Sequence, residues 1–162
     1  MERTDFTKIE HYISQAGLLF NRLVLVADEG DYCPPLSRSN IFPRRWPAIS
    51  LGIRLSEQLL DLSGRQRVFR VGRLVEEMVS ESRGDVVVLD HLDLLFTTEL
   101  AQDPLLLLQK LGRATNRTMV AVWPGRFEGE ALVHAEPGHR EYRRYTRPEC
   151  IVISLSEAAV AP

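Results

Sequence analysis

The 162-residue sequence lacks several features that would assign it to a specialised class of protein. It has no apolar run long enough to span a bilayer, and its N-terminus carries acids without the apolar core of a secretory signal. The formal net charge is only −2, which excludes a global attraction to nucleic acid. No internal repeat or low-complexity stretch interrupts the chain. We therefore expect one globular domain over residues 1–162.

Cysteine is scarce as well. Cys33 and Cys150 are the only two, and their separation does not match the spacing of a metal site. We expect reduced thiols in a cytoplasmic protein, and a single disulfide is the alternative.

The sequence does contain a regular alternation of strand-like and helix-like segments. The run "DVVVLD" at 85–90 is typical of a strand that is covered on both faces. We expect helices over 5–20, 53–63, 63–82 and 103–115, strands over 22–27, 48–52, 85–90, 118–125 and 149–155, and a further short strand within 130–138. Four prolines between 28 and 47 predict an irregular loop, and 156–162 is read as a tail. The alternation predicts a three-layer α/β fold with a mostly parallel sheet.

The helix expected over 63–82 has two distinct sides, with Ser63 as its N-cap. At 100° per residue, one apolar arc contains Val68, Val71, Leu74, Val75, Met78 and Val79. Arg65, Arg70 and Arg73 fall on the opposite side. These arginines form either a solvated face of the helix or a face that binds phosphate or a partner.

The segment after the first strand fails as a phosphate-binding loop. The P-loop pattern G-x-x-x-x-G-K-[ST] needs glycines that turn backbone N–H groups onto phosphate, a lysine and a hydroxyl. When it is laid without gaps on 27–34, Gly30 is the only glycine and Cys33 takes the lysine position. Asp28, Glu29 and Asp31 add negative charge, and each carboxylate at about 4 Å from an anion costs roughly 1–4 kcal/mol. We therefore expect the phosphate cradle to be lost.

The end of the strand at 85–90 matches the pattern of a nucleotide-binding site better than the segment after the first strand does. "VVVLD" looks like a Walker B strand that places Asp90 at the magnesium position. His91 follows where a hydrolytic member usually carries glutamate, and Asp93 substitutes for it only if the backbone turns. Gly30, Asp90 and Asp93 are accordingly the candidates for nucleotide and magnesium binding.

Two other interpretations of the acidic residues stay open. A receiver domain would use Asp28, Glu29 and Asp90, but the strand at 149–155 ends without the lysine that a receiver needs. A metal site would use Asp28, Asp31 and Asp90, with Asp93 beside them, because carboxylates at strand ends bind hard cations. A solvated acidic loop is the alternative to both.

Several longer stretches resemble one particular family. "DVVVLDHLDLLF", "WPGR" at 123–126 and "AEPGHREYRRY" at 135–145 are similar to BrxF, the small P-loop-type protein of type III BREX bacteriophage-defence systems. The resemblance runs from about residue 18 to residue 155, apart from 28–45. It implies a bacterial cytosolic protein with a P-loop NTPase-type fold, ATP and Mg²⁺ as cofactors, and larger phage-defence proteins as partners. The altered loop falls on the residues that would bind nucleotide.

The segment "GHREYRRYTR" at 138–147 combines arginines with aromatic residues. Its candidate binding residues are Arg140, Tyr142, Arg143, Arg144, Tyr145 and Arg147, and Arg126 is a further candidate for phosphate. The four arginines of the segment would share one face if it were helical. Arginine contacts phosphate and tyrosine stacks on bases, so nucleic acid, a nucleotide phosphate or an acidic protein surface would suit the segment. An exposed segment with tyrosines packed on a sheet edge is the structural alternative.

These observations lead to three functional hypotheses. The first is a P-loop-like accessory protein of a phage-defence complex that acts through protein contacts, with DNA possible nearby and little ATP hydrolysis. The second is an ATPase or switch with an atypical loop and Asp90 on magnesium. The third is a nucleic-acid-binding module that uses residues 140–147.

Overall fold

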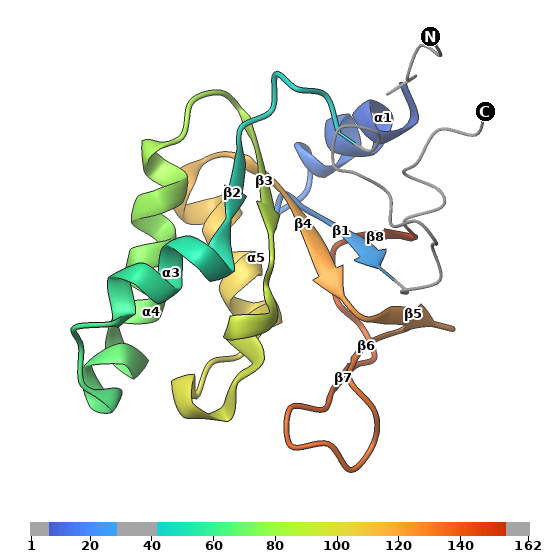
Figure 1. Cartoon of the computed structure of the whole chain (residues 1–162). Helices are drawn as coiled ribbons and strands as arrows, with labels where there is room; N and C mark the ends of the chain where they lie inside the picture. Colours follow the sequence, from blue (N-terminus) through green and yellow to red (C-terminus); the bar gives the residue numbers. More distant parts are fainter. Residues whose placement is uncertain (1–6, 29–41, 155–162) are drawn as a thin grey trace, which may run out of the picture.

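The computed structural model of the chain describes residues 7–28 and 42–154, apart from the side chain of Asp28. Its elements are α1 (Thr7–Ala16), β1 (Leu23–Asp28), β2 (Ala48–Ser50), α3 (Leu51–Leu59), α4 (Gly64–Glu81), β3 (Val86–Asp90), the 3₁₀ turns η1 (Asp93–Phe96) and η2 (Thr98–Leu100), α5 (Pro104–Thr115), β4 (Thr118–Pro124), β5 (Arg126–Glu128), β6 (Ala131–His134), β7 (Arg143–Tyr145) and β8 (Ile151–Ser154). The predicted α/β class is confirmed (Figure 1).

Five strands form one parallel sheet in the order β2-β3-β4-β1-β8 (Figure 1). β1 lies inside the sheet between β4 and β8, and its residues 23–27 have no exposed surface. A strand that is buried on both faces needs an apolar residue at every position, which explains the continuous run that marked it in the sequence. The expectation of a mostly parallel sheet is confirmed.

Helices cover both faces of this sheet. Leu23 and Leu25 pack in a core with residues of α3, α4 and α5. The alternate residues Val24 and Val26 pack instead with Ile9 of α1. Since successive side chains of a strand point to opposite faces, the two cores lie on opposite sides of the sheet. This arrangement is compatible with a three-layer α/β fold.

Two helices begin at the residues that their sequence signals predicted. Ser63 accepts a hydrogen bond from the backbone of Gln66, whose side chain accepts one from the backbone of Ser63, so α4 starts with a capping box. Asp103 accepts from the backbone N–H of Leu106 at 3.2 Å, and Pro104 occupies the first turn of α5.

The two-sided character of α4 is also confirmed. Val71, Val75, Met78 and Val79 are buried, and Val68 and Leu74 are partly buried. Arg65, Arg70 and Arg73 are exposed, as expected. Arg73 pairs with Glu77 one turn later at 3.3 Å.

Arginines satisfy the carbonyl groups at two helix ends. Arg67 donates from Nε to the carbonyl of Leu59 at 2.9 Å, at the end of α3. Arg117 donates to the carbonyls of Val79 and Ser82, at the end of α4. A cation at a helix C-terminus also interacts favourably with the helix dipole.

A second, smaller sheet was only partly predicted. β5, β6 and β7 form an antiparallel sheet, in which β6 is the short strand expected within 130–138. Trp123, near the end of β4, joins it to the main body. Its indole N–H donates to the carbonyl of Val133 at 3.0 Å, and its ring meets Phe96 and Tyr145 edge-on, with centroids 5.1 and 5.9 Å away.

Several element boundaries differ from the expectation. The helix expected over 5–20 ends at Ala16, and Leu18 and Phe20 are exposed rather than part of its apolar side. Gly17 follows the last turn directly, which is a frequent helix-end signal. The strand expected over 48–52 ends at Ser50, because α3 already begins at Leu51. Most of the loop expected over 28–47 lies outside the described residues.

No helix in the described part of the chain is both long and apolar enough to cross a bilayer.

Two helical glycines provide a matched test of the packing. A Cβ on Gly112 of α5 would lie 2.6 Å from the carbonyl oxygen of Asn21, whereas a Cβ on Gly72 of α4 meets nothing within 4 Å. We expect Gly112→Ala to lower the free energy of unfolding by about 1–3 kcal/mol through overpacking. Gly72→Ala is expected to raise it by about 0.5–1 kcal/mol through helix propensity. Urea denaturation measures both, and a gain in stability from Gly112→Ala would contradict the packing of α5 against the chain before β1.

Candidate functional site

The carboxyl ends of the parallel strands meet at one edge of the main sheet. The connection after β1 leads toward β2 at one side, whereas the connection after β4 leads toward β8 at the other. Ligands of open α/β sheets bind where the strand order reverses in this way. The reversal lies between β1 and β4, where Asp28 pairs in register with Pro124. The predicted site residue Asp90 ends β3 at the same edge, beside Ser50 of β2.

Asp90 and His91 form a local polar cluster with Ser50. The backbone N–H of His91 donates to Oδ1 of Asp90 at 2.8 Å, and the Asp90 side chain is 23% exposed. Ser50 Oγ lies 2.9 Å from Nδ1 of His91, and Asp90 Oδ2 lies 3.8 Å from the same nitrogen. A serine–histidine–aspartate relay needs the two ring nitrogens to face different partners. This cluster uses one nitrogen for both, so its geometry does not activate Ser50 as a nucleophile.

The backbone turns sharply at His91. Its φ is 56°, in the left-handed region that few residues other than glycine adopt. Gly52 at the start of α3 approaches closely, since a Cβ there would lie 2.9 Å from the carbonyl oxygen of His91. The turn sends the chain away from the strand direction and into η1, which begins with Asp93.

The candidates for nucleotide and magnesium binding are only partly visible. Gly30 and Asp31 lie outside the described residues, and of Asp28 only the backbone is described. Asp93 is exposed, at the start of η1. Within the ranges 7–28 and 42–154, no group of three or more histidine, cysteine or acidic side chains is placed to hold a metal ion.

The spacing of the strands limits what the edge can bind. β4 separates β1 from β3, so the ends of these two strands lie about 10 Å apart. A ligand that contacts both ends must therefore bridge this distance, either as an extended group such as a polyphosphate or through side chains that reach toward it from both strands.

The arginine-aromatic segment 138–147 is not helical. Turns lead into β7, which pairs with β6, so the shared helix face that its arginines would have had does not form. Arg140 pairs with Glu99 at 2.7 Å, and Arg143 donates to the carbonyl of Gln102 at 3.1 Å. Tyr142 is partly buried.

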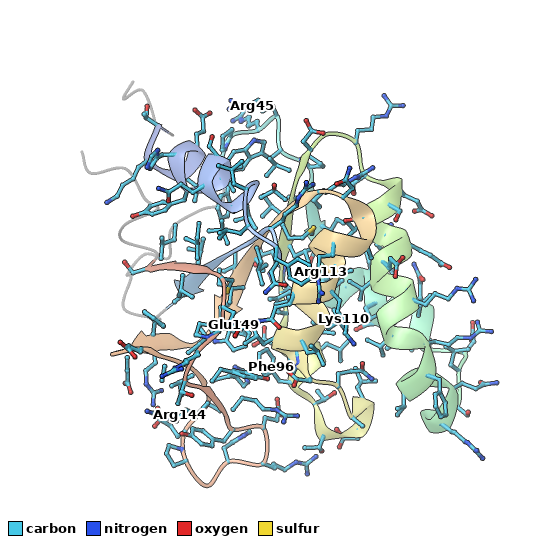
Figure 2. All side chains as sticks on the ribbon, turned by 180° about the vertical axis from the view of Figure 1, so that it is seen from behind. Arg45, Phe96, Lys110, Arg113, Arg144 and Glu149 are labelled. Carbon is cyan, nitrogen blue, oxygen red and sulfur yellow. The ribbon has the colours of Figure 1, made fainter. Side chains whose placement is uncertain are left out.

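Two arginines of the segment remain on the surface. Arg144 and Arg147 are exposed, and neither has an ion-pair partner within the described ranges. Figure 2 shows Arg144 on the small sheet, on the side away from α4. The segment therefore offers nucleic acid two arginines without an ion pair in the described part of the chain, whereas a helix would have offered four on one face.

Arg126 is likewise held by neighbouring groups. Its guanidinium pairs with Glu128 and, at 2.9 Å, with Glu136. The hydrogen bond to Glu128 is the main cause of a raised pKa of Arg126, and the negative charges of both carboxylates add to it. A phosphate would have to displace two carboxylates to reach this side chain.

Burial makes the Cys150 thiol and the Tyr145 hydroxyl harder to ionise. It raises the pKa of the Cys150 thiol to about 12, so the thiol is neutral near pH 7 and a poor nucleophile. Burial also raises the pKa of Tyr145, and the hydrogen bond that its hydroxyl donates to Asp103 at 2.9 Å adds to the effect. Tyr145 is thus a structural contact between β7 and the N-cap of α5.

A surface feature that the sequence did not reveal lies beside the cluster around Asp90. A groove of about 720 Å³ runs between α3 and η1, and His91 and Asp93 form part of its wall. Its remaining lining residues are Gly52, Ile53, Ser56, Glu57, Leu94, Thr97 and Glu141. The groove combines three segments that are far apart in sequence. The only local signal for it was Ile53, an apolar residue that lies off the core-facing side of its helix.

Comparison of the chain with protein-family models, with curated proteins and with solved structures finds no match. The functional interpretation therefore depends on the residues and geometry described above.

Two adjacent arginines of β7, Arg143 and Arg144, allow a direct test of which side chains of this segment hold the fold together. Arg143→Ala should lower the free energy of unfolding by about 1–2 kcal/mol, because it removes a charged hydrogen bond to the Gln102 carbonyl. Arg144→Ala should change it by less than about 0.5 kcal/mol, because that side chain is exposed. Urea denaturation of the two variants makes the comparison. Equal effects of the two substitutions would contradict the structural role of Arg143.

Proposed function

We propose that this protein is an accessory component of a bacterial, BREX-type phage-defence complex. In this proposal it is a cytoplasmic, P-loop NTPase-like scaffold whose nucleotide-binding loop has degenerated. It acts through protein contacts with other phage-defence proteins and not through ATP hydrolysis.

The architecture of the main sheet supports the scaffold part of the proposal. The sheet is parallel, its strand order reverses between β1 and β4, and Asp90 ends β3 at the ligand-binding edge. These are the positions at which a P-loop-type protein would hold phosphate and magnesium.

The residues that follow β1 in the sequence are unsuited to binding a nucleotide. The gapless alignment leaves Gly30 as its only glycine, with Asp28, Glu29 and Asp31 around it and no lysine within reach in sequence. Carboxylates repel a triphosphate, and Pro34 and Pro35 cannot donate backbone hydrogen bonds to it.

The distribution of charge favours a protein partner over DNA. Arg126, Arg140 and Arg143 are bound to groups of the same chain, so fewer cations are available for a phosphate backbone. The groove beside Asp93 combines apolar and acidic groups, which is unsuited to nucleic acid and suited to a polypeptide.

The thermal midpoint of the pure protein tests the proposal against an active nucleotide switch. We expect no shift with Mg-ATP, Mg-GTP or Mg²⁺ alone. A ligand at about 100 times its dissociation constant would add roughly 2.7 kcal/mol and raise the midpoint by several degrees. A rise with nucleotide that Asp90→Asn removes, and that the exposed control Asp85→Asn retains, would establish nucleotide binding at Asp90 and so favour the ATPase or switch instead. A rise with Mg²⁺ alone would establish an acidic metal site.

Association with the defence system needs a separate measurement. The tagged chain, produced together with the other proteins of a type III BREX system, should co-purify with at least one of them. Deletion of its gene should reduce the protection against phage. Full protection without the gene would contradict the accessory role.

A further inference from the structure

The groove beside η1 continues along α3 into a second hollow. This second hollow has about 470 Å³ and shares Ser56, Leu94 and Thr97 with the groove. Its other lining residues are Leu59, Leu60, Gly64, Arg67, Glu99 and Leu100. We refer to the two hollows together as the α3 trough. From Gly52 to Leu60 it follows the helix for about 12 Å, slightly more than two turns.

The outer face of α3 carries two exposed apolar residues, Ile53 and Leu60, next to the carboxylate of Glu57. The core side of the helix is formed by Leu51, Leu55 and Leu59. Ile53 and Leu60 lie nearly opposite, because they are turned by about 160° and 140° from the centre of that side at 100° per residue. They are 60% and 72% exposed and line the two parts of the trough. Their spacing of seven residues places them two turns apart on one face.

Carboxylates border the same trough. Glu57, Asp93 and Glu141 line its larger part, and none of the three has an ion-pair partner in the part of the chain that the structure describes. The cations nearby are already engaged, since Arg140 pairs with Glu99 and Arg67 donates to the carbonyls that end α3. An apolar floor with unpaired negative charge on its rim is complementary to a segment with apolar and basic residues.

We propose that the α3 trough docks a basic amphipathic helix of a partner protein. Two or three turns of that helix place one or two apolar side chains between Ile53, Leu60 and Leu94. Lysine or arginine residues on its flanks meet Glu57, Asp93 and Glu141. This is the helix-in-groove mode of recognition, in which apolar anchors give affinity and rim charges give specificity. The inference deepens the proposed function, because it assigns the protein contact to one surface.

Binding of a defined peptide tests the inference. The probe is a fluorescein-labelled, 14-residue amphipathic helix of leucine and lysine, followed by fluorescence anisotropy with the full-length protein. Two comparison peptides of the same length replace the leucines by serine or the lysines by glutamate. We expect the leucine–lysine peptide to bind at least about tenfold more tightly than either, since the trough offers both an apolar floor and negative charge.

Matched variants show where the peptide binds. The trough variant Glu57→Gln/Asp93→Asn/Glu141→Gln should weaken binding roughly tenfold, because it removes three exposed ion pairs, each of which contributes only modestly to affinity. The control Glu76→Gln/Asp85→Asn/Glu130→Gln removes the same charge at exposed positions away from the trough and should leave the affinity within about twofold. Ile53→Ser/Leu60→Ser should also weaken binding, with an unchanged circular dichroism spectrum.

Three outcomes would overturn the inference. They are no preference for the leucine–lysine peptide, equal weakening by the trough and control variants, and a concentration-dependent molecular mass that Ile53→Ser/Leu60→Ser abolishes. The last would assign the trough to a second copy of the chain. The peptide result is independent of the thermal measurement, because a nucleotide-induced rise would reject the proposed function and leave selective peptide binding intact.

Discussion

The burial of β1 on both of its faces is the constraint on which the rest of the structure depends. Residues 23–27 are inaccessible to solvent, so apolar layers must cover the strand from two sides at once. α5 and its neighbours form one layer, and α1 with Phe42 contributes to the other. The close approach of Gly112 to the backbone at Asn21 follows from the same requirement, because α5 must lie against the chain that enters β1. With the core fixed in this way, function is left to the strand ends and the outer helix faces.

The charged residues divide into those that hold the fold together and those that remain available. Arg67 and Arg117 satisfy carbonyls at helix ends, and Arg143 fastens the small sheet to the segment before α5. These arginines are bound to groups within the chain. The surface therefore carries less available positive charge than the number of arginines in the sequence suggests. Glu57, Asp93 and Glu141, which line the larger part of the α3 trough, have no ion pair of this kind within the described ranges. A protein of nearly neutral net charge thereby acquires a locally acidic, partly apolar surface.

The sequence predicted best those elements whose pattern repeats over many residues. The strand of β3 and the two-sided helix α4 were correctly placed, because burial on both faces or on one side leaves a continuous or periodic signal. β5 and β7 were missed, since three residues such as "RFE" or "RRY" carry no period and are strands only through pairing with β6. For the candidate site, Asp90 was expected at a strand end and is found there. The partners of Arg140 and Arg143 are about forty residues away in sequence, and no local pattern identifies such contacts.

The placement of the two tryptophans gives the molecule an internal optical reporter. Trp123 is fully buried against Phe96 and Tyr145 at the joint between the two sheets, whereas Trp46 is partly exposed beside Phe42 on the α1 side. In Figure 2, Phe96 lies between α5 and the small sheet, at the joint between the two sheets. Loosening of that joint would hydrate Trp123 and shift its emission to longer wavelength without changing the surroundings of Trp46. The intrinsic fluorescence of the chain therefore distinguishes detachment of the small sheet from loss of the layer that covers β1 on the α1 side.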